Sequence, residues 1–262
     1  MNGRVRGSGS SVTAADVALP LVGLAAATAA WWAIVAAFDV PSYLLPPPDA
    51  VAAVIAGNPG LFVRNAVATA EKVAIGGTVG IAIGFVLAAL IAHLPWLRRA
   101  VYPYLVTVRV LPKIAIAPLL LIYVGTGTTT AVVFIGLIAF FPMVLSTAAG
   151  FDRVPDEQRD LLRSVDAGSL DAFLRLELPY AVPDLFAGLK QSVTLAVIGA
   201  VVAEWIVADS GLGYLILLAS ENVQVDLMLA ALAVLVALGL SLYGLIVLTQ
   251  RRVGWEPSAT DA

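Results

Sequence analysis

The fold is decided by residues 151–214, which read FDRVPDEQRDLLRSVDAGSLDAFLRLELPYAVPDLFAGLKQSVTLAVIGAVVAEWIVADSGLGY. The first part of this stretch is rich in charged residues. The second part, from about Ala187 to Ala208, is an apolar run that contains one acid, Glu204. The chain on both sides of the stretch is apolar enough to lie in a membrane. A polar segment of this length between apolar runs indicates a place where a membrane protein meets a soluble partner.

The composition of the whole chain predicts a membrane protein. Of its 262 residues, 60% are hydrophobic and 13% are charged, whereas charged residues make up about 25% of a soluble domain. Apolar runs of roughly 20 residues, long enough to cross a bilayer, recur along the chain. We therefore expect an all-α polytopic membrane protein, because the short alternating segments of a membrane barrel do not appear. The absence of cysteine excludes disulfides and thiolate metal sites.

The apolar runs predict six transmembrane helices and a single membrane domain over 17–249. The basic residues before the first run resemble a signal peptide, but the run exceeds the 7–15 or so apolar residues of a signal, so we expect an uncleaved span. Prolines 46–48 precede a short interfacial helix at 49–56. Polar tails are expected at 1–16 and 250–262, and a polar loop at 151–186. The expected spans are 17–38, 66–92, 101–124, 129–149, 187–208 and 227–249.

The third expected span is unusual because it contains Arg109, Pro112, Lys113 and Pro118. Proline at membrane depth frees backbone carbonyls, which protein or a water-lined cavity must then satisfy. Charged side chains at that depth generally face the interior of a helix bundle. The sequence therefore predicts that this span lines the interior of the protein and breaks near Pro112.

The distribution of basic residues predicts the orientation of the chain. Lys and Arg accumulate in the cytoplasmic loops of membrane proteins. With both termini in the cytoplasm, Arg64 is the one basic residue in the outer loops. The cytoplasmic segments then hold eleven: Arg4, Arg6, Arg98, Arg99, Arg153, Arg159, Arg163, Arg175, Lys190, Arg251 and Arg252. We expect six spans, cytoplasmic termini and a cytoplasmic polar loop.

The sequence shows no constellation of catalytic residues. It contains no GxxxxGK[ST] pattern for holding nucleotide phosphates. Its one histidine, His93, is expected to cap a helix or lie at the membrane interface. Neither Ser146 nor Ser192 has the neighbouring base that an intramembrane protease needs. We expect no enzyme activity and no metal or cofactor bound by this chain.

Glu204 is the strongest single candidate for a functional residue. It either packs by hydrogen bonding to a neighbouring helix, or lines the solute path or its outer gate, as intramembrane ionisable groups commonly do. Its expected partners are Arg109 or Lys113. Lys72 is expected to lie near the outer surface and to reach into solvent. The turn containing Gly211 and Gly213 follows Glu204 at the expected outer end.

The charged part of the opening stretch predicts a helical hairpin. Asp156 and Glu157 follow Pro155, and acids favour the positive end of a helix dipole. A turn is expected at 166–169, after which Leu170 and Phe173 begin a second amphipathic segment. An ordinary cytoplasmic loop rarely combines such a hairpin with an immediately following span.

This hairpin resembles the cytoplasmic loop of the inner-membrane permeases of bacterial ABC importers. Three positions depart from the family pattern: Asp160 replaces a glutamate, Leu162 an alanine and Asp166 a glycine. Aspartate adopts left-handed backbone angles more easily than most residues, so we expect the turn to be kept. The residues that match or stand at the pattern's positions are Asp160, Leu162, Arg163, Asp166, Ala167, Phe173, Leu178 and Pro179.

The resemblance covers most of the chain and is closest to the nitrate, sulfonate and taurine branch. Within that branch, residues 199–217 look most like permeases for pyrimidine precursors of thiamine. Stretches that carry the resemblance are LLPPPDAV (44–51), RVLPKIAIAPLLLIYVGTG (109–127), AFFPMVLSTAAGF (139–151), GLK (188–190) and AEWIVADSGLGYLI (203–216).

The resemblance implies alternating access in a bacterial inner membrane. Two copies of this chain would form the pore, each above an ATPase that binds ATP–Mg, and an external binding protein would deliver the solute. The implied ATPase-coupling residues are Asp160, Arg163, Val165, Asp166, Ala167, Gly168, Leu170, Phe173 and Pro179, with the coupling helix at about 164–171. The expected path or gate residues are Arg109, Pro112, Lys113, Glu204, Gly211 and Gly213. The alternative is a secondary transporter or channel that works without an ATPase.

Overall fold

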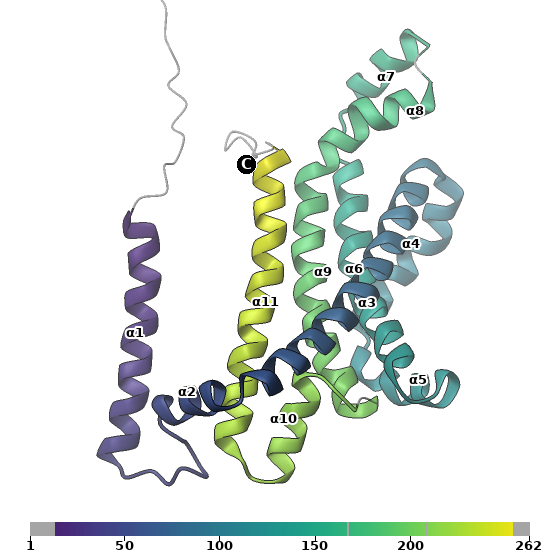
Figure 1. The fold of residues 1–262 in the computed structure, drawn as a ribbon. Coiled ribbons are helices and arrows are strands. Elements are labelled where there is room, and N and C mark those ends of the chain that lie inside the picture. The colour runs from purple at the N-terminus through teal and green to yellow at the C-terminus, as the bar shows by residue number, and fades with distance from the viewer. Residues whose placement is uncertain (1–13, 167, 208, 254–262) are drawn as a thin grey trace, which may run out of the picture.

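The computed structural model describes residues 14–166, 168–207 and 209–253, and these residues form helices joined by short turns (Figure 1). Five helices are long and apolar enough to cross a membrane, and a sixth span is obtained when a bent helix pair is counted as one. The expectation of an all-α membrane protein with six spans is thus confirmed. The elements are α1 (Ala14–Ala37), α2 (Pro48–Gly57), α3 (Pro59–His93), α4 (Pro95–Val110), η1 (Lys113–Ile116), α5 (Ala117–Val124), α6 (Thr128–Phe151), α7 (Asp156–Ser164), α8 (Ser169–Ala172), η2 (Phe173–Glu177), α9 (Leu178–Val207), α10 (Leu212–Glu221) and α11 (Val225–Val253).

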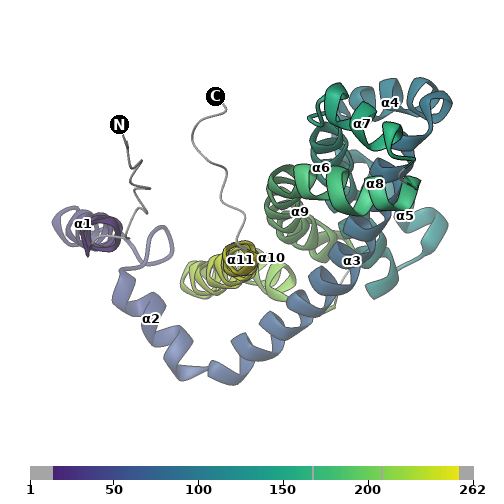
Figure 2. The same ribbon diagram turned by 90° about the horizontal axis from the view of Figure 1, so that it is seen from above.

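The centre of the bundle is α6, which packs against α3 on one side and α9 on the other (Figures 1 and 2). Its buried side chains include Phe134, Ile135 and Val144. A Cβ atom on Gly80 of α3 would overlap the backbone of Gly136 in α6. Small residues of this kind let membrane helices approach closely, where van der Waals contact drives association. The α3–α6 contact therefore depends on glycine.

The helices at the edge of the bundle are much more exposed. The first span, α1, stands apart from α3, α6 and α9 in both views and is mostly exposed along its length (Figure 2). It is followed by α2, which begins in the proline run as expected. α10 and α11 pack on each other and on α9. Apolar side chains exposed on a membrane-spanning helix face lipid or another subunit.

The expected third span is broken, as its prolines predicted. α4 ends at Val110, and the helix axis turns by 99° before η1 and α5 continue. The prediction that this span lines the interior of the protein stays a prediction. Leu105 and Ala117 are buried, but Tyr104, Val110 and Tyr123 are among many exposed large side chains of the segment. The break turns α5 outward, so much of its surface is exposed in the part of the chain that the structure describes.

The charged hairpin also forms as expected. α7 starts with Asp156 and Glu157 in its first turn. α8, η2 and α9 then run as one helical stretch of 39 residues from Ser169 to Val207. The hairpin projects beyond the membrane helices on the side where α1 begins and α11 ends (Figure 1). The fifth membrane helix therefore starts at the hairpin itself, earlier than the expected residue 187.

Candidate functional site

Three places in the fold bring polar side chains together, and the first surrounds Glu204 near the end of α9. The Glu204 side chain is completely buried. Lys72 of α3 lies 3.1 Å from its Oε1 atom, and Thr69 Oγ1 lies 2.9 Å from the same oxygen. The backbone N–H of Gly213 donates to Oε2 at 2.8 Å. A buried carboxylate with this many partners is stable because its charge is paired and hydrogen-bonded.

The same cluster fixes the turn between α9 and α10. Lys72 donates to the carbonyl oxygen of Ser210, and the Leu212 N–H donates to Thr69 Oγ1 at 2.8 Å. Asn65 Oδ1 accepts from the Gly211 N–H at 2.9 Å. We call the set Asn65, Thr69, Lys72, Glu204 and 210–213 the Glu204 cluster. It joins α3, α9 and the start of α10.

Glycine is required at position 211 within this cluster. Its φ of +120° is rarely adopted by residues with a side chain, and a Cβ atom there would overlap the Glu204 carboxylate. Gly213 is also tight, since a Cβ atom would lie 2.9 Å from Glu204 Oε2. The sequence places these two glycines in the turn that follows Glu204, and the structure shows that both lie against the Glu204 carboxylate.

The cation shown beside the Glu204 carboxylate is Lys72. Lys72, which the sequence places near the outer surface, is 3% exposed and pairs with Glu204, whereas the sequence favours Arg109 or Lys113 as its partner. The complete burial of Glu204 agrees with the packing interpretation in this conformation, and its role at a path or outer gate stays a prediction. The missed residues carry a signal in the sequence. Asn65, Thr69 and Lys72 are spaced by four and three residues, which places them on one face of a helix.

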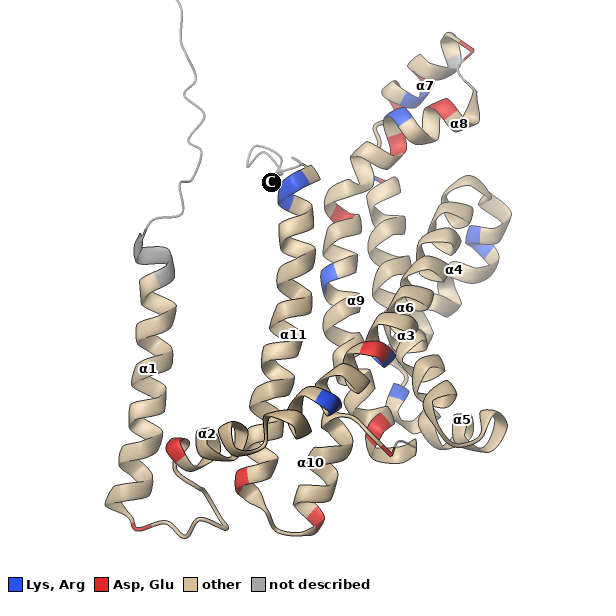
Figure 3. Cartoon of the chain, in the orientation of Figure 1, with Lys and Arg blue, Asp and Glu red and all other residues tan. Residues whose placement is uncertain are grey.

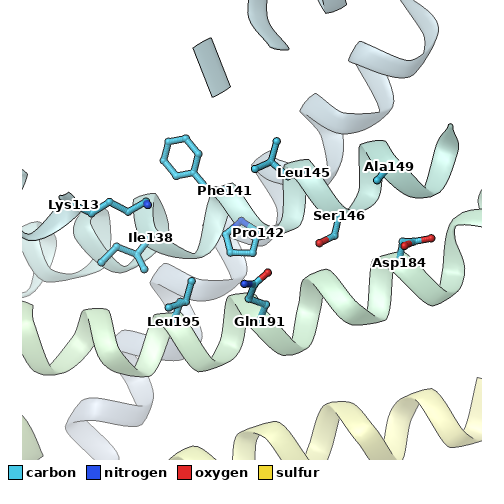
Figure 4. A pocket seen from close by; sticks show the side chains of 10 residues that line it. All are labelled: Lys113, Ile138, Phe141, Pro142, Leu145, Ser146, Ala149, Asp184, Gln191 and Leu195. Carbon is cyan, nitrogen blue, oxygen red and sulfur yellow. The ribbon is translucent and has the colours of Figure 1, made fainter. Parts of the chain in front are cut away.

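The second place is a cleft of about 300 Å³ between α6 and α9, with Lys113 of η1 at one end (Figure 4). The ammonium of Lys113 lies 5.1 Å from the centre of the Phe141 ring. On α9, Asp184 and Gln191 are seven residues apart and so share a face. The lining residues are Lys113, Ile138, Phe141, Pro142, Leu145, Ser146, Ala149, Asp184, Gln191 and Leu195. We call this space the α6–α9 cleft.

The expected path residues do not all lie at the α6–α9 cleft. Lys113 lines it, and Pro112 lies at the break just before η1. Gly211, Gly213 and Glu204 belong instead to the Glu204 cluster. The side chain of Arg109 lies outside the described part of the chain. The structure therefore divides the expected path between two separate sites.

The third place is the coupling loop, which we define as 156–177. Four large apolar side chains on it are more than half exposed: Leu161, Val165, Leu170 and Leu174. Asp166 has a φ of +51°, so aspartate adopts the left-handed angle expected of the family's glycine. Gly168 has a φ of −60°, which lies outside the left-handed region. Asp160 is exposed on α7, Ala167 lies outside the described residues, and so does the side chain of Arg163.

Phe173 lies at the base of the coupling loop, away from its tip. Its ring packs 5.7 Å from that of Phe151, which is fully buried, and 5.5 Å from the imidazole of His93. It belongs to η2, a π-helical turn in which the Leu178 N–H reaches back to the Phe173 carbonyl. Pro179 follows in the first turn of α9 and is half-buried. Phe173 thus contacts the membrane helices, whereas Val165 and Leu170 are the exposed apolar side chains at the tip of the loop.

Ion pairs hold residues 152 and 153, which precede the coupling loop. Arg153 pairs with Asp184 at 3.0 Å, and Arg98 makes two contacts of 2.7 Å with Asp152. Figure 3 shows basic residues on the loop, at the end of α11 and on α4. The segment between α6 and α7 is therefore attached to α4 and α9 by charged contacts.

Comparisons with known proteins agree on one family. The model for "Binding-protein-dependent transport system inner membrane component" matches residues 80–255. A probable ABC transporter permease protein of Haemophilus influenzae is 34% identical over 213 residues, covering 81% of this chain and 87% of that protein. The formylaminopyrimidine transport permease protein ThiX of Halalkalibacterium halodurans is 35% identical, covering 70% and 74%.

A third relative and a solved structure extend the similarity. The taurine transport system permease protein TauC of Escherichia coli is 28% identical over 257 residues, covering 92% of this chain and 90% of that protein. A chain from inward-facing conformations of the MetNI methionine ABC transporter superposes with a TM-score of 0.66. It is 20% identical and covers 75% of this chain and 98% of that one.

Proposed function

Because the chain belongs to the family of binding-protein-dependent transport system inner membrane components, we propose that it carries a small polar organic solute through an ABC importer. Members of this family are permease subunits, and a separate subunit hydrolyses ATP. The family also implies partners: an ATPase, a solute-binding protein and the membrane. In this proposal ATP–Mg binds to the partner ATPase, and two copies of the present chain form the pore.

The observation that carries the coupling role is the exposed apolar tip of the coupling loop. Val165 and Leu170 are 65% and 69% exposed, on a hairpin that projects past the membrane helices (Figure 1). Exposed apolar side chains with a charged rim suit a groove on a partner protein. We propose that the ATPase supplies this groove and that Asp160, Arg163 and Asp166–Gly168 form the rim and turn.

The arrangement of the termini supports cytoplasmic ends. The first residues of α1, the last residues of α11 and the coupling loop lie on one side of the molecule (Figure 1). If the ATPase binds the loop, this side is cytoplasmic, in agreement with the bias of basic residues. Fusions of alkaline phosphatase and green fluorescent protein to each terminus test the orientation. Phosphatase activity at either terminus contradicts it.

We propose the α6–α9 cleft as a contact site for the solute. Its Lys113 suits an anionic group, and Gln191 and Ser146 offer hydrogen bonds to ring nitrogens or carbonyls beside the Phe141 ring. This chemistry suits a pyrimidine precursor of thiamine, and a sulfonate or nitrate-like anion is the second candidate. Calorimetry of these solutes with the cognate binding protein distinguishes the two classes.

Uptake by purified protein tests the proposed function. The chain is co-expressed with its ATPase and binding protein, reconstituted into proteoliposomes, and supplied with radiolabelled solute. We expect uptake that requires ATP and both partners. Uptake driven by an ion gradient in vesicles without the ATPase would instead identify a secondary transporter or channel. Replacement of Gln191 by leucine is expected to weaken uptake several-fold, because it removes a hydrogen-bonding group from the cleft.

A further inference from the structure

The turn between α10 and α11 contains a valine in a backbone conformation that valine rarely adopts. Val223 has a φ of +55°, inside the left-handed region. Within the described part of the chain, the other residues with a side chain and a positive φ are Asp39 and Asp166. Aspartate tolerates this region because its short polar side chain can hydrogen-bond locally, whereas a β-branched side chain is crowded against its own backbone. The conformation of Val223 is therefore strained.

Two backbone hydrogen bonds impose this conformation on position 223. The Gln224 N–H donates to the Ala219 carbonyl at 2.9 Å, and the Val223 N–H donates to the Ser220 carbonyl at 3.2 Å. This pair of bonds is the Schellman motif that commonly ends a helix, and its left-handed position is usually occupied by glycine and sometimes by asparagine. Either of those residues would end α10 with less strain.

Packing within the described chain gives little reason for a valine at this position. The Val223 side chain is 63% exposed, and residues 221–224 are all exposed. A valine here therefore adds strain and buries little apolar surface in return. Strained residues of this kind persist mainly at functional sites, where the side chain serves another purpose.

The position of the turn and its charges indicate what kind of partner it fits. The turn lies at the end of the molecule opposite the coupling loop (Figure 1). Acidic residues lie at the end of α10 and at the start of α11 (Figure 3), and these are Glu221 and Asp226. Acids are repelled by anionic lipid headgroups. An exposed apolar side chain between two acids instead fits a protein surface with an apolar hollow and basic residues around it.

We propose that residues 221–226, the outer docking turn, bind the external solute-binding protein. Val223 enters an apolar hollow of that protein, and the two acids face basic residues at its rim. Because the Schellman bonds already hold the turn, little conformational entropy is lost on docking. The ten residues of α10 connect the turn to the Glu204 cluster, where the Leu212 N–H is bound. This inference rests on the importer function proposed above.

The test measures the affinity of the purified cognate binding protein for the complete permease–ATPase complex in lipid nanodiscs. Val223→Gly is expected to raise Kd at least about tenfold, because it removes an apolar side chain that docking buries. The same variant is expected to raise the melting temperature by about 2–4 °C, because glycine relieves the left-handed strain. Wild-type affinity in Val223→Gly would overturn the proposal.

Two further substitutions at this position separate the side chain from the backbone. Val223→Asn also suits the left-handed position, and it is expected to be stable and to bind weakly. Val223→Ile is the matched control, since it keeps a branched apolar side chain, and we expect wild-type affinity and stability. Co-purification of the ATPase, expected to be normal in all three variants, shows that each complex is assembled. Equal affinity in Val223→Asn and Val223→Ile would refute a docked apolar side chain.

Glu221→Gln tests the charges at the rim. Charges at the edge of an interface mainly change the association rate and its dependence on salt. We expect slower association of the binding protein at low ionic strength, with the difference from wild type lost at high ionic strength. An unchanged association rate at low ionic strength counts against basic residues on the partner.

A photoactivatable amino acid at position 223 identifies the partner directly. We expect it to crosslink to binding protein added outside proteoliposomes. The same amino acid at position 248, a 58% exposed leucine toward the other end of α11, is the control and is expected to give no such product. A product at position 223 that contains only a second copy of this chain or a lipid would exclude the proposed partner.

Uptake by the wild-type complex separates this inference from the importer function on which it rests. If wild-type uptake does not require the binding protein, the importer function itself fails. If wild-type uptake requires the binding protein and Val223→Gly binds it with unchanged affinity, only the role of the outer docking turn fails.

Discussion

Lys72 and Glu204 form an ion pair of 3.1 Å that is almost completely shielded from solvent, although 132 residues separate them in the chain. The pair joins α3 to α9 beside the turn at 210–213, whose backbone it also binds. If the turn at 210–213 forms part of an outer gate, such a pair would hold this turn against the helix bundle. Opening would require both charges to find other partners.

Removing one member of this pair is expected to destabilise the protein strongly. Glu204→Gln or Lys72→Met leaves the remaining charge buried without its partner, which costs about 3–5 kcal/mol. Unfolding in detergent measures this cost. The neighbouring variant Glu71→Gln is the matched control, because Glu71 is exposed, and its expected effect is within about 0.5 kcal/mol.

The double variant Lys72→Met/Glu204→Gln is expected to cost clearly less than the sum of the single variants. Residues in contact show coupling energies of about 0.5–3 kcal/mol in a double-mutant cycle. Additive effects would contradict a direct interaction between the two side chains.

Alanine at position 211 is expected to disrupt the same cluster through the backbone. Gly211 has a left-handed φ of +120°, and its Cβ position overlaps the Glu204 carboxylate. Strain of this kind costs about 1–3 kcal/mol. Gly57→Ala, where a Cβ atom meets nothing within 4 Å, is the control and is expected to be neutral. Equal melting temperatures for the two variants would disprove the predicted contact.

The packing of α3 on α6 predicts opposite results for two glycines of one helix. Gly80→Ala is expected to destabilise the protein by about 1–3 kcal/mol, because the new methyl group would overlap the backbone of Gly136. Gly77→Ala is expected to be tolerated, since its methyl group would make an ordinary 3.6 Å contact with Ala196. Thermal unfolding of both variants in one detergent provides the comparison.

The exposed tip of the coupling loop predicts a loss of assembly without a loss of folding. Leu170→Glu places a charge where the proposed ATPase groove is apolar, and we expect at least tenfold weaker co-purification of the ATPase. Val223→Glu, at the opposite end of the molecule and 63% exposed, is the control and is expected to bind normally. Normal assembly of Leu170→Glu would argue that the tip lies outside the interface.

The elements that could be predicted from the sequence depend on local signals. The break at Pro112, the helix start at Asp156 and the left-handed turn at Asp166 each follow from residues within a few positions. The length and apolarity of the spans likewise fix the fold class. Resemblance to the permease family then predicted the coupling loop and its partners.

The contacts that could not be predicted join residues far apart in the chain. The sequence favours Arg109 or Lys113 as the partner of Glu204 and places Lys72 near the outer surface. Which face of α3 turns toward α9 depends on packing of the whole bundle, including the contact at Gly80. His93 and Glu177 meet for the same reason, through the docking of α9 beside α3.

The unbroken helix from Ser169 to Val207 has a mechanical consequence. At 1.5 Å per residue its 39 residues span nearly 60 Å, roughly twice the hydrocarbon thickness of a bilayer. One end belongs to the coupling loop and the other stops three residues beyond Glu204. The stretch contains the π-helical turn η2 and Pro183, and a movement imposed at the coupling loop would be carried along one continuous helical backbone to the end beside Glu204. Events at the two faces of the membrane can thus be synchronised without a chain of intermediate side-chain rearrangements.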